Sequence, residues 1–339
     1  MPTCLLVHET PAACARRLQA QGYDPETARQ VASYLDQAHD ILPWLDQLEH
    51  AFDAQGLGFR FVDLASFEDE VAGLSPRSTM IWLMTDGFRF YQGTYSLALA
   101  EQRGLPLFAH DSGLAFLASD KLRAGAVLKG LGAPTPATFS LPLDINAELD
   151  GGLFVKPRHL GAKIGIWADS HCHTSGDANL LAERIARTYG DEAIAQAYVP
   201  GDNIRVSFLD VTGDAGPDAL GVYRLIVEDD HQTMMDSMAL YGENASASPP
   251  AMADLRVETP ALATEIADTI WDLKQVLGLG GVFSFDLRAG RGHTPKLIEF
   301  EVCPGLPCYD FVHYCRDQLG LDLPEAMARA AAARINQLG

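Results

Sequence analysis

Residues 281–311 read GVFSFDLRAGRGHTPKLIEFEVCPGLPCYDF, and this stretch decides the fold that the sequence predicts. Apolar residues alternate with other residues in 282–287 and again in 296–302, and the segment between these runs contains Gly and Pro, which favour a turn. The pattern predicts a β-hairpin. Successive side chains of a strand point to opposite faces, so Glu299 and Glu301 should share one face of the hairpin. If Asp286 lies opposite them on the first strand, three carboxylates converge.

Three converging carboxylates repel one another, and a divalent cation would relieve that repulsion. Carboxylate oxygens are hard ligands that suit Mg²⁺, which is usually held by a few carboxylates together with substrate phosphates. The alternative is a solvent-facing strand edge that carries ordinary surface charges. The hairpin alone does not decide between a metal site and such an edge.

The composition limits the class of protein. A chain of 339 residues exceeds what one core usually organises and suggests two or three packed units, and 47% hydrophobic residues can supply a sizeable core. The net charge of -20 disfavours nucleic acid or an anionic membrane as the main partner. No apolar run is long enough to span a bilayer, and the start of the chain lacks the pattern of a signal peptide. Six cysteines without CxxC spacing favour a reducing cytoplasm.

The first third of the chain alternates strand and helix patterns. The runs 3–7, 59–64 and 80–84 read as strands, and helix-compatible sequence covers 11–21 and a longer stretch from Pro25 to about Ala54. Such alternation predicts a parallel α/β layer. Ligands bind beyond the carboxyl ends of strands in these layers, so residues near those ends are weak substrate-site candidates. They are His8, Glu9 and Arg89.

The middle of the chain carries basic residues beside possible phosphate-binding loops. Ser119 is a plausible cap of a helix that begins with Lys121, and Lys156 lies at the end of a strand-like run. The segment from Gly161 to Gly165 follows it, and backbone amides of such loops can cradle phosphate oxygens. Further on, residues 236–253 read as a long loop of the kind that often forms a lid.

Several short motifs occur in a recognisable order. They are DKLRAG at 120–125, GAPTP at 132–136, FVKP at 154–157, AYVPG at 197–201, FDLR at 285–288 and LIEFEVCPGL at 297–306. This order resembles the ATP-grasp ligases, especially the D-alanine:D-alanine ligase and ribosomal-protein glutamate ligase branches, from Asp111 onwards. The resemblance implies an α/β (α+β mixed) chain with the ATP-grasp fold and an amino-terminal parallel α/β domain. The expected domains are 1–112, a small lid subdomain at 113–200 and a large subdomain with the magnesium site at 201–339.

The resemblance also implies a nucleotide site. Lys121 and Lys156 would approach the phosphates as point charges on long stems. The glycine loop, with Gly161, Lys163 and Gly165, would close over the triphosphate.

A hinge would read the edge of the adenine through its backbone. Four consecutive residues form this hinge: Gln196, Ala197, Tyr198 and Val199. Asn203 or its neighbour Asp202 would lie near the ribose. Asp286, Glu299 and Glu301 fall where the family binds magnesium, so ATP and Mg²⁺, or Mn²⁺ in its place, are the implied cofactors.

The chain departs from the family pattern at several positions. Ser284 stands where the D-alanine:D-alanine ligases carry an arginine that stabilises a developing oxyanion, and Arg205 and Arg224 are the available substitutes, between which the sequence does not choose. Ala162 replaces the serine of the glycine loop, and Glu301 replaces a metal-binding asparagine.

The substrate side departs from the pattern too. After the Pro-Gly turn that contains Gly305, the chain reads PCYD at 307–310 instead of the serine that holds the acceptor carboxylate. Asp310 could attract an amino group, and Tyr241 matches a tyrosine of the dipeptide ligases loosely. These differences argue against a cell-wall D-alanine ligase.

The implied function is ATP-dependent joining of a carboxylate to an amine through an acylphosphate, on an amino acid or a small peptide-like substrate. Two alternatives stay open: a nucleotide-binding regulatory or scaffold protein that has lost ligation, and a carboxylate kinase. The expected partners are small-molecule carboxylates and amines, and a homodimer is compatible with the sequence. A zinc cluster formed by Cys303, Cys308, His313 and Cys315 is disfavoured, since their spacing suits no common site.

Overall fold

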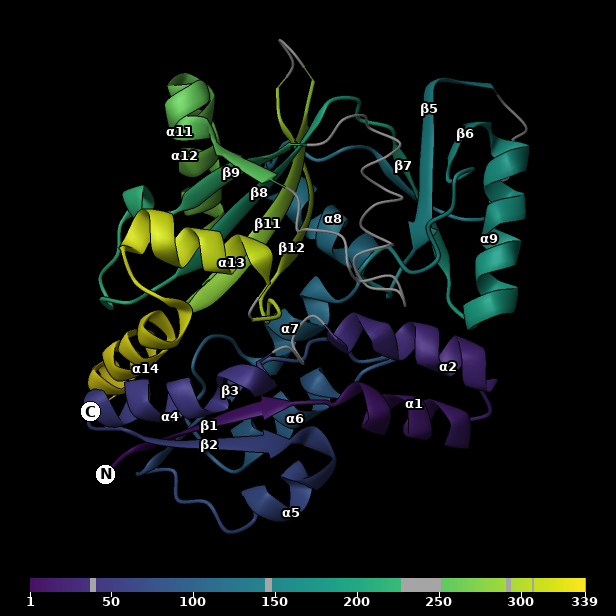
Figure 1. The fold of residues 1–339 in the computed structure, drawn as a ribbon. Coiled ribbons are helices and arrows are strands. Elements are labelled where there is room, and N and C mark those ends of the chain that lie inside the picture. The colour runs from purple at the N-terminus through teal and green to yellow at the C-terminus, as the bar shows by residue number, and fades with distance from the viewer. Residues whose placement is uncertain (37–40, 144–147, 227–250, 291–293, 307, 339) are drawn as a thin grey trace.

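The described part of the chain forms three sheets (Figure 1). The computed structural model describes residues 1–36, 41–143, 148–226, 251–290, 294–306 and 308–338. The mixed α/β class expected from the sequence is confirmed. The domain boundaries at 112 and 200 stay predictions.

The amino-terminal layer is a parallel sheet, as predicted. Its strands have the order β2-β1-β3. They are β1 (Thr3–His8), β2 (Gly58–Asp63) and β3 (Thr79–Leu83). The helices of this layer are α1 (Pro11–Ala20), α2 (Pro25–Ala32), α4 (Leu45–Ala54), α5 (Phe67–Val71) and α6 (Gly93–Gln102).

Two local predictions in this part of the chain were wrong. The single helix expected from Pro25 to about Ala54 is interrupted, because α2 ends at Ala32 and a 3₁₀ turn covers Ser33–Leu35. Pro43 lies in a second 3₁₀ turn, Leu42–Trp44, directly before α4, since proline lacks the N–H that a helix interior requires. The cap of α8 (Lys121–Gly130) is Asp120 and not Ser119, since the Asp120 carboxylate accepts the backbone N–H of Arg123.

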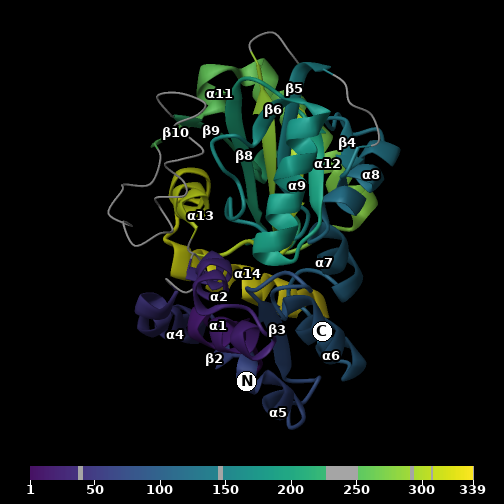
Figure 2. The same cartoon turned by 90° about the vertical axis from the view of Figure 1, so that its right-hand side faces the viewer.

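The small sheet is antiparallel and has the order β4-β7-β5-β6. Its strands are β4 (Thr138–Ser140), β5 (Glu148–Pro157), β6 (His171–Thr174) and β7 (Ala193–Ala197). Helix α9 (Ser175–Tyr189) packs along this sheet (Figure 2). The helices α7 (Ser112–Ala118) and α8 connect the small sheet to the amino-terminal layer.

The large sheet contains the predicted hairpin and has the order β10-β9-β8-β11-β12. Its strands are β8 (Asp202–Leu209), β9 (Gly221–Ile226), β10 (Ala251–Asp254), β11 (Val282–Ala289) and β12 (Lys296–Glu301). Asp286 pairs with Glu299 and Ser284 pairs with Glu301, so the three carboxylates share one face of the hairpin. The helices α11 (Leu255–Glu258) and α12 (Pro260–Leu277) follow β10.

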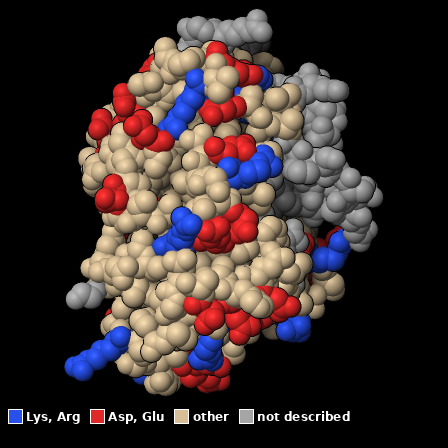
Figure 3. Space-filling model, turned by 60° about the vertical axis from the view of Figure 1, so that its left-hand side comes forward, with Lys and Arg blue, Asp and Glu red and all other residues tan. Residues whose placement is uncertain are grey.

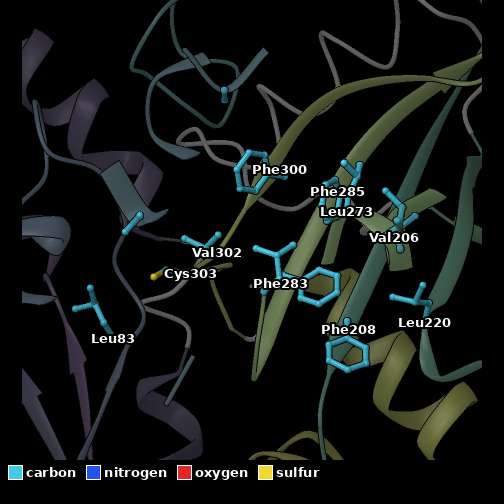
Figure 4. Packing of buried hydrophobic residues seen from close by; sticks show 14 of the residues in the cluster. Leu83, Val206, Phe208, Leu220, Leu273, Phe283, Phe285, Phe300, Val302 and Cys303 are labelled. Atoms are coloured by element: carbon cyan, nitrogen blue, oxygen red, sulfur yellow. The ribbon is translucent and has the colours of Figure 1, made fainter. Parts of the chain in front are cut away.

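The two faces of β11 have different roles. Phe283, Phe285 and Leu287 are buried in the main core, which also contains side chains of α12 (Figure 4). The intervening residues, including Ser284 and Asp286, point to the other face because strand side chains alternate. The same strand therefore anchors the sheet and presents polar groups to the centre of the molecule.

The helices at the carboxyl end of the chain lead back to the amino-terminal layer. Helix α13 (Tyr309–Tyr314), a π-helical turn at Cys315–Leu319 and helix α14 (Leu323–Leu338) follow the hairpin. Met327 of α14 and Phe52 of α4 belong to one buried cluster, so α14 packs against the amino-terminal layer (Figures 1 and 2).

All six cysteines are free thiols, and five of them are buried. The four buried hydrophobic clusters each contain at least one: Cys303 in the main core, Cys4 and Cys315 in the cluster of α4 and α14, Cys14 between α1 and α2, and Cys172 in the small sheet. Burial raises the pKa of the Cys14 thiol to about 12.

The surface carries acidic and basic side chains side by side on the face shown in Figure 3. In the described part of the chain, no helix is both long enough and apolar enough to cross a membrane.

Buried His110 should make folding depend on pH. Its Nε2–H donates to the Val282 carbonyl oxygen at 2.6 Å, and burial lowers its pKa from 6.5 to about 4. Because the folded pKa lies below the unfolded one, the stabilisation is complete above pH 6.5 and is lost as the pH falls towards 4, by up to about 3 kcal/mol at ~1.4 kcal/mol per pH unit. Urea unfolding of the native protein and His110→Gln between pH 4 and 7 measures the difference, and parallel pH profiles would contradict this role of His110.

Candidate active site

The candidate active site is a charged cluster on the polar face of the hairpin. Asp286 of β11 lies opposite Glu299 of β12, as predicted, and Glu301 lies two residues further along β12. Arg205 of β8 stands opposite Asp286 on the other side, because β8 pairs with β11 in that register. The cluster thus forms from three adjacent strands of one sheet.

Arg205 binds three different carboxylates. Its Nη1 donates to Asp286 Oδ1 at 2.8 Å, its Nη2 to Glu301 Oε2 at 2.7 Å and its Nε to Asp310 Oδ2 at 3.0 Å. Asp310 is fully buried in α13 and also accepts from the Ser207 hydroxyl at 2.8 Å. Asp310, which we expected at the amine site, is therefore a partner of Arg205.

The two predicted phosphate-binding lysines converge on Glu299. Lys121 begins α8 and Lys156 lies near the end of β5, and their Nζ atoms lie 3.7 and 3.6 Å from the same oxygen, Glu299 Oε2. Lys121 also donates to the Leu160 carbonyl oxygen at 2.8 Å. Two elements from outside the large sheet thereby bring positive charge to its polar face.

The charges shift the pKa values of the hairpin acids in opposite directions. Burial raises the pKa of Asp286 to about 6; Arg205 opposes this shift, and the nearby Glu299 and Glu301 add to it. Burial also favours the neutral form of Glu299, but Lys156, Lys121 and Arg205 outweigh it and lower the pKa of Glu299 to about 2. Burial lowers the pKa of Lys156.

The donor set fits a hard divalent cation. Among the described residues, no group of three or more His, Cys, Asp or Glu side chains is placed so that it could hold a metal ion. However, Glu299 Oε2 is buried and receives no hydrogen bond from the described part of the chain. Asp286 holds a raised pKa beside two other acids, so a cation near it would be favoured.

The predicted phosphate loop adopts a constrained conformation. Ala162 and Lys163 have φ angles of 47° and 59°, which non-glycine residues seldom adopt and which often mark functional loops. A Cβ atom on Gly161 would lie 2.8 Å from the ring of Tyr34, so this loop packs closely on the amino-terminal layer. The Tyr34 hydroxyl in turn donates to Asp86 at 2.7 Å.

The predicted adenine hinge comprises the last two residues of β7 and the two residues after it. The Gln196 side chain is buried and donates to the Thr138 hydroxyl at 3.1 Å. The Ala197 N–H donates to the Ala137 carbonyl at 2.8 Å, and the ring of Tyr198 stacks on His171 at a centroid distance of 3.8 Å. The segment is thus held from both sides.

Arg288 fixes the turn after the hinge, and the sequence analysis missed it. Its Nε donates to the Val199 carbonyl at 2.7 Å, Nη2 to the Gly201 carbonyl at 2.8 Å and Nη1 to Asn203 Oδ1 at 2.8 Å. Strand alternation could have found it, because Arg288 lies two residues after Asp286 and shares its face.

The other candidate residues lie elsewhere. Arg224 pairs with Glu258 and stands opposite Ile204, so it points to the opposite sheet face from Arg205. Gly305 lies between β12 and α13, where its carbonyl accepts the Cys308 N–H at 3.0 Å. Tyr241 and most of the expected lid lie outside the described residues.

The weak candidates of the amino-terminal layer are engaged in internal contacts. Glu9 is buried and pairs with Arg17 at 2.7 Å. His8 Nδ1 lies 3.0 Å from the Thr85 hydroxyl. Arg89 lies 3.7 Å from Asp191.

Solved structures share this fold over their whole length. A D-alanine–D-alanine ligase from Bacillus anthracis matches with a TM-score of 0.66 and 16% identity over 100% of both chains. A structure of that enzyme complexed with ATP matches with a TM-score of 0.63 and 12% identity over 100% of both chains. D-alanyl-alanine synthetase A from Vibrio cholerae matches with a TM-score of 0.62 and 14% identity over 99% of this chain and 98% of that one.

These structures confirm the fold expected from the sequence, that of the ATP-grasp ligases, and the sequence is similar to those of enzymes named D-alanine–D-alanine ligase. Its relatives include the D-alanine–D-alanine ligase of Marinobacter nauticus, 26% identical over 82% of this chain and 78% of the relative. The enzyme of that name from Hydrogenovibrio crunogenus is 32% identical over 63% of this chain and 65% of the relative. No family model matches the chain.

Proposed function

We propose that this chain joins the carboxylate of an amino acid or small peptide-like molecule to the amine of a second substrate, with ATP converted to ADP and phosphate. The observation that carries the proposal is the convergence of Lys121 and Lys156 on Glu299, within one cluster with Asp286 and Arg205. Such an arrangement binds phosphate oxygens and a cation at one place.

The reaction proceeds in two balanced steps. A carboxylate oxygen of the first substrate attacks the γ-phosphorus of ATP, and ADP leaves. The amine nitrogen then attacks the carbonyl carbon of the acylphosphate, inorganic phosphate leaves, and the nitrogen loses a proton. Mg²⁺ held by hairpin carboxylates, for which Asp286, Glu299 and Glu301 are the candidates, would neutralise phosphate charge. Lys121 and Lys156 would hold the phosphate oxygens and release Glu299 as they do so.

Arg205 is our candidate for the residue that stabilises the oxyanion in the second step. A guanidinium has five N–H donors, and the bonds to described residues use three, one on each nitrogen. The remaining donors on Nη1 and Nη2 would serve a substrate oxygen. Arg224 is the weaker choice because it lies on the other face of the sheet.

The substrates are expected to differ from those of a D-alanine–D-alanine ligase. Ser284 supports this, since it replaces the family arginine and donates instead to Glu301 at 3.0 Å. Gly305 and Cys308, in the segment that lacks the family serine, would border the acceptor. We expect no contact between Asp310 and the amine, given its burial behind Arg205. The cytoplasm and a homodimer stay predictions for this enzyme.

The first test is nucleotide binding followed by product analysis. ATP with Mg²⁺ at a hundredfold excess over the dissociation constant should stabilise the native protein by about 2.7 kcal/mol in thermal unfolding. Most of that stabilisation should be lost in the variants Lys121→Ala, Lys156→Ala and Glu299→Ala. The control is Lys129→Ala, which changes an exposed lysine of α8, the helix that also contains Lys121, and should keep the stabilisation. Absence of stabilisation in the folded native protein would count against the nucleotide site.

A panel of amino acids and dipeptides then separates the alternatives. ADP formation with an amide product supports the ligase. ADP formation without amide in the presence of amines identifies a carboxylate kinase. Nucleotide binding without ADP formation across the whole panel favours the regulatory protein. The replacement of two family residues by Ser284 and Ala162 supports that alternative.

Arg288 should control nucleotide affinity more than turnover. Arg288→Met keeps much of the side-chain stem but leaves the Val199 and Gly201 carbonyls without their donor, so we expect the KM for ATP to rise about tenfold, consistent with the ~1.5 kcal/mol that such charged bonds contribute. Steady-state kinetics with varied ATP measures it. The control is Arg316→Met on an exposed arginine, and a fall in kcat with unchanged KM would contradict this role of Arg288.

A further inference from the structure

We propose that Arg205 is a permanent cation of the site, so that a single divalent ion binds between Asp286 and Glu299 and Glu301 is not a metal ligand. This inference rests on the proposed function and narrows its metal site. It follows from the unequal ways in which the hairpin carboxylates are already bound.

Glu301 is satisfied without a metal. Its Oε2 accepts from Arg205 Nη2 at 2.7 Å and from the Ser284 hydroxyl at 3.0 Å. The serine stands directly opposite Glu301 in the hairpin. The positive charge that neutralises Glu301 comes from Arg205 on the neighbouring strand β8.

Arg205 cannot turn away from this position without leaving a buried acid unpaired. Its Nε holds Asp310, which is fully buried and which Ser207 also binds. The register of β8 and β11 sets Arg205 directly opposite Asp286. An unpaired buried carboxylate is strongly unfavourable, so Asp310 keeps the guanidinium in place when substrates enter.

Glu299 and Asp286 are bound differently. Glu299 Oε2 receives no hydrogen bond from the described residues, and its nearest cations are two lysines at 3.6 and 3.7 Å whose long stems can turn to phosphate. Asp286 uses Oδ1 for Arg205, which leaves Oδ2 for a second partner. Directly opposed residues of antiparallel strands are close enough to share one ion.

The charge balance favours one added ion. The ion pairs of the cluster join four carboxylates, Asp286, Glu299, Glu301 and Asp310, to three cations, Arg205, Lys121 and Lys156. One divalent ion turns this net negative cluster positive, as binding of a triphosphate requires.

The test counts Mn²⁺ ions by electron paramagnetic resonance of the free ion, with and without a non-hydrolysable ATP analogue. We expect one Mn²⁺ per native chain in the presence of the analogue. The matched variants are Glu299→Gln and Glu301→Gln, which remove one charge each without a change in size. Glu299→Gln should lower the affinity for Mn²⁺ at least about 100-fold, because it removes a metal ligand. Glu301→Gln should lower it less than about fivefold, because only the longer-range electrostatic attraction between Glu301 and the ion is lost. Equal weakening by both variants would overturn the inference.

A variant of Arg205 tests whether this arginine takes the place of a second metal ion. Arg205→Gln should bind a second Mn²⁺, since Asp286 and Glu301 then lose their cation. The native protein decides the question even if this variant fails to fold: two ions per chain overturn the inference and leave the ligase proposal intact. If neither Mn²⁺ nor the analogue binds, the inference and the proposed function both fail.

Discussion

Replacement of Arg205 by lysine should lower kcat by about 10²- to 10³-fold while the protein stays folded. Lysine keeps the positive charge that Asp310 and Asp286 require, but it has three donors on one atom in place of a planar fork. A lysine that satisfies the buried Asp310 would have no donor left in a fixed direction for a developing oxyanion. Losses of this size are typical when one such donor is removed.

The comparison variant is Arg224→Lys, because Arg224 was the other candidate and its side chain lies on the opposite face of the sheet. We expect its kcat to change less than about threefold, as is usual for exposed ion pairs. Single-turnover measurement of ADP and amide formation shows which step Arg205→Lys slows. A fall in kcat for Arg224→Lys alone would mean that Arg224, and not Arg205, stabilises the oxyanion.

Phe285→Ala should lower the free energy of unfolding by about 3–5 kcal/mol. Phe285 is fully buried in the middle of β11, its ring lies 5.6 Å from that of Phe300 on β12, and it meets Phe283 edge-on at 5.7 Å. Its removal leaves a cavity at the contact between the hairpin and α12. Urea unfolding followed by circular dichroism measures the change.

Phe139→Ala is the matched control for this prediction. Phe139 is a strand residue of β4 with 43% of its surface exposed, whereas Phe285 is 0% exposed. We expect the control to change the free energy of unfolding by less than about 1 kcal/mol. Similar losses in the two variants would mean that the core does not depend on the face of β11 that we assign to it.

The hairpin could be predicted from sequence because it is local. Strand alternation assigns each residue of 282–287 to one face of the hairpin, and Glu299 and Glu301 share a face because they are two residues apart. The choice between Arg205 and Arg224 could not be made that way. It depends on which residue of β8 stands opposite Asp286 and on which stands opposite Arg224, and the register between strands leaves no trace in the periodicity of either strand.

The function of Asp310 was also beyond the sequence. An acid after a Pro-Gly turn reads as an open substrate contact, but α13 turns it inwards against Ser207. The break of the helix before α4 was missed for a different reason: Pro43 was visible, but the amphipathic pattern continued across it. Tertiary contacts determine where Asp310 lies, and the backbone constraint of proline determines where α4 begins.

The distribution of thiols gives the protein a set of native reporters. A buried thiol reacts with an alkylating reagent only when its surroundings open, so its labelling rate measures local opening. Cys172 would report on the small sheet, Cys303 on the hairpin, and Cys14 on the contact between the first helices and the glycine loop. Mass spectrometry of the unmodified chain, with and without nucleotide, would show which of these regions loosens to admit substrates.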